Sequence, residues 1–222
     1  MNLVTLTNAL SKLQVPDLRE DDAANSSSTC IALIYGFAAR EHMQRNLLRL
    51  LRESGHKNTS LYGHLQAIRI ANDLQAASVK GQKIVVIGYS QGGLEAVRVA
   101  HELDKRGVKI ALLVTIAGGG RGRLLPHRWA DDPRAIPANV ARCLNYFSEN
   151  DLLGSDSPLE KNLAVPISNK QYIENILFSK EDRVSHIAIA KCYPVDKVHP
   201  RVSEKLLKRL QSELAALQKE CP

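Results

Sequence analysis

Residues 83–97, KIVVIGYSQGGLEAV, join a continuous apolar run to an amphipathic pattern through a short turn rich in glycine. The run at residues 83–89 has the length and the unbroken apolar character of a strand that is buried on both faces. The pattern after the turn has helical spacing, with apolar positions at Leu94, Val97, Ala100 and Leu103. A buried strand that leads directly into a helix is the repeating unit of an α/β protein, so this segment predicts the fold class.

The rest of the chain repeats this alternation of apolar runs and helical patterns. Further strands are expected at residues 30–35, 59–62, 109–117, 140–147 and 171–178. Helices are expected at residues 43–54, at 64–79 and from Pro200 onward. The predicted fold is α/β, with a minimal, mostly parallel sheet of about six strands, helices on both faces and right-handed crossovers.

The turn itself, Gly88-Tyr89-Ser90-Gln91-Gly92, has the pattern G-x-S-x-G. In a tight turn between strand and helix, a side chain at either glycine would collide with its neighbours, and a strained serine would lift its hydroxyl clear of the sheet. The helix N-terminus would bring partial positive charge and N–H groups close to that hydroxyl. The motif predicts Ser90 as a nucleophile. A plain glycine-rich turn or a phosphate-binding loop is the alternative, but the segment lacks the lysine of a P-loop and the G-x-G-x-x-G spacing.

The sequence GYSQGG after a buried strand resembles the nucleophile elbow of the α/β-hydrolases, in particular small lipases, cutinases and carboxylesterases. The resemblance covers the chain from about residue 30 to its end through strand order and motif positions, and the missing N-terminal strand pair resembles the minimal single-domain lipases. It implies a serine hydrolase of the α/β-hydrolase fold, in which an acidic residue and then a histidine follow the serine along the chain.

Two histidines lie late enough in the chain to fit that order. His186, in SHIAI, lies a few residues after the last predicted strand, where the family places its histidine, and it is the favoured base. His199, in VHPRV, is the alternative, although Pro200 is typical of the first residue of a helix. The resemblance therefore assigns the base to His186.

The acid is expected in the turn SENDLLGSDS that follows the strand at residues 140–147. Asp151 stands shortly past the strand end, at the usual position in the resembling family, where it would accept a hydrogen bond from the imidazole and hold its tautomer. Asp156 and Glu149 are the alternative acids. A further alternative is that this acidic segment is only a solvated turn with no catalytic role.

An oxyanion hole in this family needs two backbone N–H groups. The resemblance assigns one to Gln91, the residue after the nucleophile, and the other to Phe37, in the loop after the strand at residues 30–35. Where the lipases have His-Gly, this chain has Tyr35-Gly36, a mild departure because the backbone makes the contact. The alternative is that Gly36 merely ends a strand.

The chain of 222 residues is expected to form a single domain over residues 1–222. Residues 1–25 contain one short amphipathic helix. Residues 118–137 form an irregular, lid-like excursion that leaves the carboxyl edge of the sheet and could partly cover Ser90. Its apolar and basic side chains would suit an acyl chain with an anionic head, such as a phospholipid or a coenzyme A thioester. An ordinary polar loop is the alternative.

The composition fits a globular protein without a membrane span. Hydrophobic residues make up 44% and charged residues 24%, and no apolar stretch approaches the roughly 20 residues of a spanning helix. The net charge of +7 comes mostly from basic residues interleaved with acidic ones. Without a basic and aromatic stripe, a nucleic-acid partner is not expected.

No metal or organic cofactor is expected either. The four cysteines are Cys30, Cys143, Cys192 and Cys221. They lack the spacing of metal ligands and predict no disulfide framework.

The resemblance implies a lipase- or esterase-like enzyme that cleaves carboxylic esters through an acyl-enzyme on Ser90, with a small-molecule or lipid acyl ester as substrate. One alternative is the same machinery acting on thioesters or as an acyltransferase. Another is a catalytically inactive hydrolase fold that serves as a binding module. No signal-peptide pattern opens the sequence, so a cytoplasmic location is expected. No feature of the sequence favours contact with a membrane surface.

Overall fold

The computed structural model describes residues 28–119 and 132–219. The expected N-terminal helical segment, residues 1–25, and the main part of the lid-like excursion lie outside the described residues. Among the residues that are described, no helix is long and apolar enough to cross a membrane.

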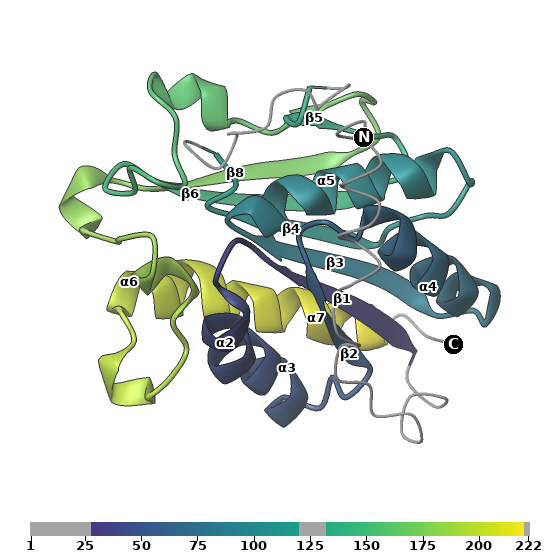
Figure 1. Ribbon diagram of the computed structural model, residues 1–222, viewed down its shortest axis with the longest axis horizontal. Coiled ribbons are helices and arrows are strands. Elements are labelled where there is room, and N and C mark those ends of the chain that lie inside the picture. The colour runs from purple at the N-terminus through teal and green to yellow at the C-terminus, as the bar shows by residue number, and fades with distance from the viewer. Residues whose placement is uncertain (1–27, 120–131, 220–222) are drawn as a thin grey trace, which may run out of the picture.

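A six-stranded sheet forms the centre of the molecule (Figure 1), with the strand order β2-β1-β3-β4-β6-β8. Every neighbouring pair in it is parallel. The strands are β1 (Thr29–Tyr35), β2 (Thr59–Gly63), β3 (Lys83–Tyr89), β4 (Leu112–Ile116), β6 (Arg142–Ser148) and β8 (Tyr172–Phe178). The expectation of a mostly parallel sheet of about six strands is confirmed, and the strand that carries the G-x-S-x-G motif lies inside the sheet.

The strands are apolar without interruption because helices bury both faces of the sheet. In β3, Val85 and Ile87 pack into one core, whereas Ile84 and Val86 pack into the other. Successive side chains of a strand point to opposite faces, so a strand that contacts two cores needs an apolar residue at every position.

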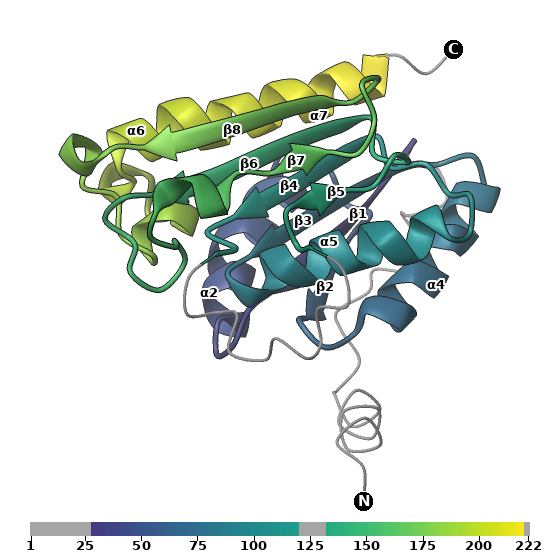
Figure 2. The same ribbon diagram turned by 90° about the horizontal axis from the view of Figure 1, so that it is seen from above.

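Two groups of helices cover the two faces, as Figure 2 shows with the sheet between α7 and the pair α4 and α5. The first group comprises α2 (Arg40–Met43), the π-helical turn η2 (Gln44–Leu48), α3 (Arg49–Glu53), α6 (Pro200–Val202), the π-helical turn η9 (Ser203–Lys208) and α7 (Arg209–Lys219). The second comprises α4 (Ala67–Val79) and α5 (Gln91–Asp104). The expectation of helices on both faces is confirmed. Neither π-helical turn was expected.

Some element boundaries differ from those expected. The helix expected from His64 begins at Ala67, because the N–H of Gly63 donates to the side chain of Gln66 and forms a turn first. The buried carboxylate of Glu95 then accepts from the N–H of Ala67, 2.8 Å away, and satisfies the new helix end. The strand expected at residues 109–117 is shorter, and its early part forms only an isolated bridge from Ile110 to Val140.

The end of the expected irregular excursion is a strand. A small second sheet pairs β5 (Ala135–Ile136) with β7 (Val165–Pro166) in parallel. Four short 3-10 helices complete the described elements, namely η5 (Leu159–Asn162), η6 (Lys180–Asp182), η7 (Ala188–Ala190) and η8 (Val195–Lys197). A two-residue strand is too short to show the alternation by which strands are recognised in a sequence.

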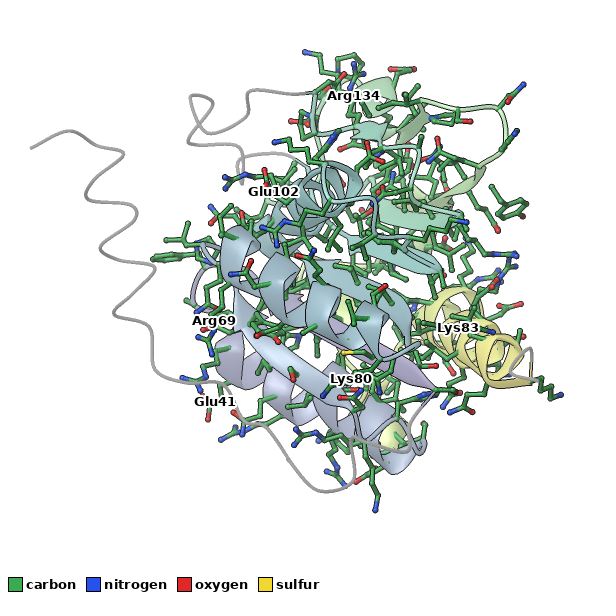
Figure 3. The ribbon with its side chains drawn as sticks, turned by 90° about the vertical axis from the view of Figure 1, so that its right-hand side faces the viewer. Glu41, Arg69, Lys80, Lys83, Glu102 and Arg134 are labelled. Atoms are coloured by element: carbon green, nitrogen blue, oxygen red, sulfur yellow. The ribbon has the colours of Figure 1, made fainter. Side chains whose placement is uncertain are left out.

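Charged side chains of both signs are spread over the face that Figure 3 presents. One of the labelled residues, Lys83, points toward the C-terminal helix, where its ammonium group donates to the carbonyl of Leu217 over 2.8 Å. A cation bound to the last carbonyls of a helix stabilises the negative end of its dipole. At least one surface lysine therefore contributes to the fold.

Candidate active site

The turn between β3 and α5 holds Ser90 in a strained conformation. Its backbone has φ 57° and ψ −129°, outside the regions that residues with a side chain ordinarily occupy. The turn is secured by two backbone hydrogen bonds of 2.8 Å, from the Ser90 N–H to the carbonyl of Ile116 and from the Gly93 N–H to the carbonyl of Ser90. Ser90 therefore stands at the N-terminus of α5 with its side chain partly exposed.

Both outer glycines of the motif are required by close backbone contacts. A Cβ atom at Gly88 would lie 2.1 Å from the carbonyl oxygen of Gly92, and one at Gly92 would lie 2.2 Å from the carbonyl oxygen of Ile34. Real carbon and oxygen atoms do not approach so closely, so any side chain here would push α5 or β1 away from the turn. This agrees with the steric reason for G-x-S-x-G.

Ser90, His186 and Asp151 form one hydrogen-bonded chain. The Nε2 atom of His186 lies 3.1 Å from Oγ of Ser90, and its Nδ1 atom lies 2.7 Å from Oδ2 of Asp151. The carboxylate is fully buried, and the imidazole is only 16% exposed. This is the arrangement in which an imidazole can accept a proton from a serine hydroxyl while a carboxylate orients it.

The loop after β6 fixes the carboxylate of Asp151. Its second oxygen, Oδ1, accepts hydrogen bonds from the N–H groups of Leu153 and Gly154, at 3.0 Å and 2.7 Å. With Oδ1 held by its own loop, Oδ2 faces the imidazole. Local hydrogen bonds within the turn DLLG thus direct this carboxylate toward His186.

The alternatives to Asp151 and His186 lie elsewhere. Glu149 accepts from the N–H of Lys180, and the loop at Asp156 is tied through its own N–H to Asn162. His199 is the N-cap of α6, where its Nδ1 accepts from the N–H of Arg201 at 3.2 Å. Among the expected acids and bases, only Asp151 and His186 meet at Ser90.

The loop after β1 passes directly against Ser90. A Cβ atom at Gly36 would lie 2.8 Å from Cβ of Ser90 and 2.9 Å from the backbone nitrogen of Gln91. Gly36 therefore does more than end a strand, because only a residue without a side chain allows this approach. Phe37 is the next residue along this loop. The assignment of the Phe37 and Gln91 N–H groups as oxyanion donors stays a prediction.

Tyr89 packs beside the imidazole of His186, and His42 packs against Tyr89; the sequence predicted neither contact. The centroid of the Tyr89 ring lies 5.1 Å from that of His186, and the ring of His42, on α2, lies 5.8 Å from that of Tyr89. Burial and then the charge of Asp151 raise the pKa of Tyr89, so its hydroxyl stays protonated. Burial, followed by the proximity of His186, lowers the pKa of His42. Tyr89 occupies a variable position of the motif, so only its place beside Ser90 could have drawn attention to it.

Comparison with known proteins links this site to a fold. No protein-family model matches the chain, and no curated protein matches its sequence. Solved structures do match. An esterase from Pyrobaculum calidifontis is 15% identical to this chain, with a TM-score of 0.56, and the match covers 99% of this chain and 93% of the esterase. A putative YdeN-like hydrolase from Pectobacterium atrosepticum is 16% identical with a TM-score of 0.52, covering 98% and 100%.

The RedJ thioesterase of the prodiginine biosynthetic pathway in Streptomyces coelicolor is a third similar structure. It is 12% identical with a TM-score of 0.50, covering 90% of this chain and 96% of its own. At such identities the likeness concerns the fold. The chain has the α/β-hydrolase fold, and the resemblance inferred from GYSQGG is confirmed at that level.

Proposed function

We propose that this protein is a serine hydrolase that cleaves carboxylic esters through an acyl-enzyme on Ser90, with His186 as general base and Asp151 as the acid that orients it. The observation that carries the proposal is the continuous chain from Ser90 Oγ through both nitrogens of His186 to Asp151, with links of 3.1 Å and 2.7 Å. Residues 1–222 are taken as one domain built around this site.

The geometry supports a two-step mechanism. His186 Nε2 takes the proton of Ser90 as Oγ attacks the ester carbonyl, and the buried Asp151 stabilises the imidazolium that forms. The N–H groups of Phe37 and Gln91 are proposed to stabilise the oxyanion. The imidazolium then protonates the departing alcohol. In the second step a water molecule gives a proton to His186 Nε2 and attacks the acyl carbonyl. The imidazolium then returns that proton to Ser90 Oγ as the bond to the acyl group breaks, which releases the carboxylic acid product and restores the serine.

Exposed apolar residues next in sequence to Asp151, His186 and Gly36 favour an ester with an apolar acyl group. Leu152 directly follows Asp151 and is 84% exposed, Ile187 directly follows His186 and is 65% exposed, and Phe37 follows Gly36 and is 77% exposed. Large apolar side chains exposed at one place are typical of binding surfaces. Because these residues are chain neighbours of the catalytic groups, an acyl chain that contacts them would have its carbonyl near Ser90.

Covalent labelling tests the proposal directly. A fluorophosphonate reacts with serines that an adjacent base activates, so the protein should be labelled at one site, and Ser90→Ala should remove the label. The variant should lose ester turnover by several orders of magnitude and keep its fold. Labelling that persists in Ser90→Ala, or esterase activity close to that of the natural protein, would exclude Ser90 as the nucleophile. A protein that takes no label would instead fit an inactive binding module.

A substrate series separates ester cleavage from thioester chemistry. p-Nitrophenyl esters of increasing acyl length, assayed beside acyl-coenzyme A of the same lengths, should give kcat/KM values that are higher for the oxygen esters. The values should rise with acyl length, by up to about tenfold for each pair of added methylenes that becomes buried. Higher kcat/KM for the coenzyme A series would assign the protein to the thioesterases or acyltransferases.

A further inference from the structure

His186 lies on a long connection between β8 and α6, outside any helix or strand, so its position depends on contacts with the rest of the molecule. Side chains from two neighbouring elements tie this connection on either side of the histidine. Before it, the hydroxyl of Ser148 on β6 donates to the carbonyl of Val184 over 2.6 Å. After it, Oδ1 of the buried Asn46 accepts from the N–H groups of Cys192 and Tyr193, at 2.7 Å and 3.0 Å.

A third tie reaches the histidine itself. The hydroxyl of Tyr89 donates a hydrogen bond of 2.8 Å to the carbonyl oxygen of His186. Tyr89 is the residue before Ser90, so this bond joins the backbone of the base to the residue that carries the nucleophile. The tyrosine is itself fixed, because it is buried in the sheet core and packs between the rings of His42 and His186.

We infer that Tyr89 is a positioning residue, whose hydroxyl sets the separation of His186 from Ser90 by holding the main chain of the histidine. The inference rests on the proposed function, since a separation of base and nucleophile has consequences only where the serine reacts. Ser148 and Asn46 fix the path of the connection, whereas Tyr89 fixes the residue that must lie within hydrogen-bond distance of Oγ.

The expected size of the effect follows from the geometry of proton transfer. A base must lie within hydrogen-bond reach of the proton that it takes, and a displacement of about 1 Å can cost roughly 10²-fold in rate. Tyr89→Phe removes the tie and keeps the aromatic ring that packs against His186. We therefore expect kcat to fall by about 10- to 100-fold with KM changed by less than about twofold, because the acyl-binding surface is untouched.

Tyr146→Phe is the matched control. Tyr146 is a fully buried tyrosine on β6, in the same core as Tyr89, and its hydroxyl has no hydrogen-bond partner among the residues that the structure describes. Both substitutions delete one buried hydroxyl from the same sheet, but only Tyr89→Phe deletes a bond to His186. Tyr146→Phe should keep the kcat and KM of the natural protein.

The experiment compares the full-length natural protein with both variants, and active sites are counted by fluorophosphonate titration. Proton NMR should show a far-downfield imidazole signal from the hydrogen bond between His186 and Asp151, assigned by its loss in His186→Ala. That signal should weaken or exchange faster in Tyr89→Phe and persist in Tyr146→Phe. A purely structural role for the hydroxyl would lower the melting temperature and leave the signal of the folded protein unchanged.

Two results would overturn the inference while leaving the proposed function standing. One is a Tyr89→Phe variant with the kcat and the downfield signal of the natural protein. The other is an unfolded Tyr89→Phe variant beside a folded Tyr146→Phe, because the bond would then determine stability rather than geometry. Failure of the proposed function is a separate result, seen when the natural protein has no Ser90-dependent turnover.

Discussion

A Cβ atom at Gly154 would lie 2.5 Å from Oδ2 of Asp151, the same oxygen that contacts His186. It would also lie 2.7 Å from Cβ of Ala117. The glycine therefore leaves the space into which the acid points, and its N–H holds the other carboxylate oxygen at 2.7 Å. One residue without a side chain thus both orients the carboxylate and makes room for it.

Gly154→Ala should consequently displace the carboxylate of Asp151 and weaken its bond to His186. We expect kcat/KM to fall by about 10²-fold, less than the loss of the acid itself, because the carboxylate remains present but misplaced. Steady-state ester hydrolysis measures the change. Gly118→Ala is the control, since a Cβ atom there would lie 3.5 Å from its nearest neighbours, an ordinary contact. Equal activities of the two variants would contradict this role of Gly154.

Local sequence signals predicted the fold and the residues that meet at Ser90. The unbroken apolar run of β3 next to a helical pattern indicated a buried parallel strand. Both patterns can be recognised within a few consecutive residues, without knowledge of the rest of the fold. Asp151 and His186 were predicted from the residue order that the resemblance implies, applied to strands that were themselves recognisable. Asp151 Oδ2 and His186 Nδ1 lie 2.7 Å apart although 35 residues separate them in the sequence, and the order of elements in the fold brings them together.

Contacts between distant segments account for what the sequence did not predict. The bond from the Tyr89 hydroxyl to the carbonyl of His186 spans 97 residues, and the bond from the N–H of Cys192 to Oδ1 of Asn46 spans 146. Neither tyrosine nor asparagine has a spacing that indicates such a role, because the partner is a backbone group that any residue would offer. The close approach at Gly154 is local, but it depends on the exact path of the turn. The fold brings the two distant pairs together, and the path of the turn sets the approach of Gly154 to Asp151.

The choice of acid can be tested by removing one charge at a time. Asp151→Asn keeps the shape of the side chain but removes the charge that stabilises the imidazolium, so turnover should fall by a factor on the order of 10⁴. Asp156→Asn is the matched control in the same loop and should change turnover by less than about threefold. Hydrolysis of one p-nitrophenyl ester by both variants is the measurement. A larger loss in Asp156→Asn would assign the acid to the other aspartate.

The two late histidines should separate activity from stability. His186→Ala should abolish ester turnover, because Ser90 then lacks a base. His199→Ala should leave turnover unchanged and lower the free energy of unfolding by about 0.5–1 kcal/mol, since the α6 N–H group at Arg201 loses its cap. Urea unfolding and ester assays on both variants measure the two effects. Loss of turnover in His199→Ala would show that His199 contributes to catalysis as well as to the helix cap.

The half-buried His42 and the buried His56 should make stability depend on pH. Burial, aided by nearby His186, lowers the pKa of His42, and burial lowers the pKa of His56. An unfolded chain titrates its histidines near about pH 6.5. Below that pH the unfolded chain binds more protons than the native protein, so the free energy of unfolding should rise from about pH 5.5 to about pH 7 and then level off. Most carboxylates are already ionised in both states across this window.

Urea unfolding of the double variant His42→Gln, His56→Gln tests this prediction. Its free energy of unfolding should rise less with pH than that of the natural protein, and an equal rise in both would exclude these two histidines as the source of the pH dependence.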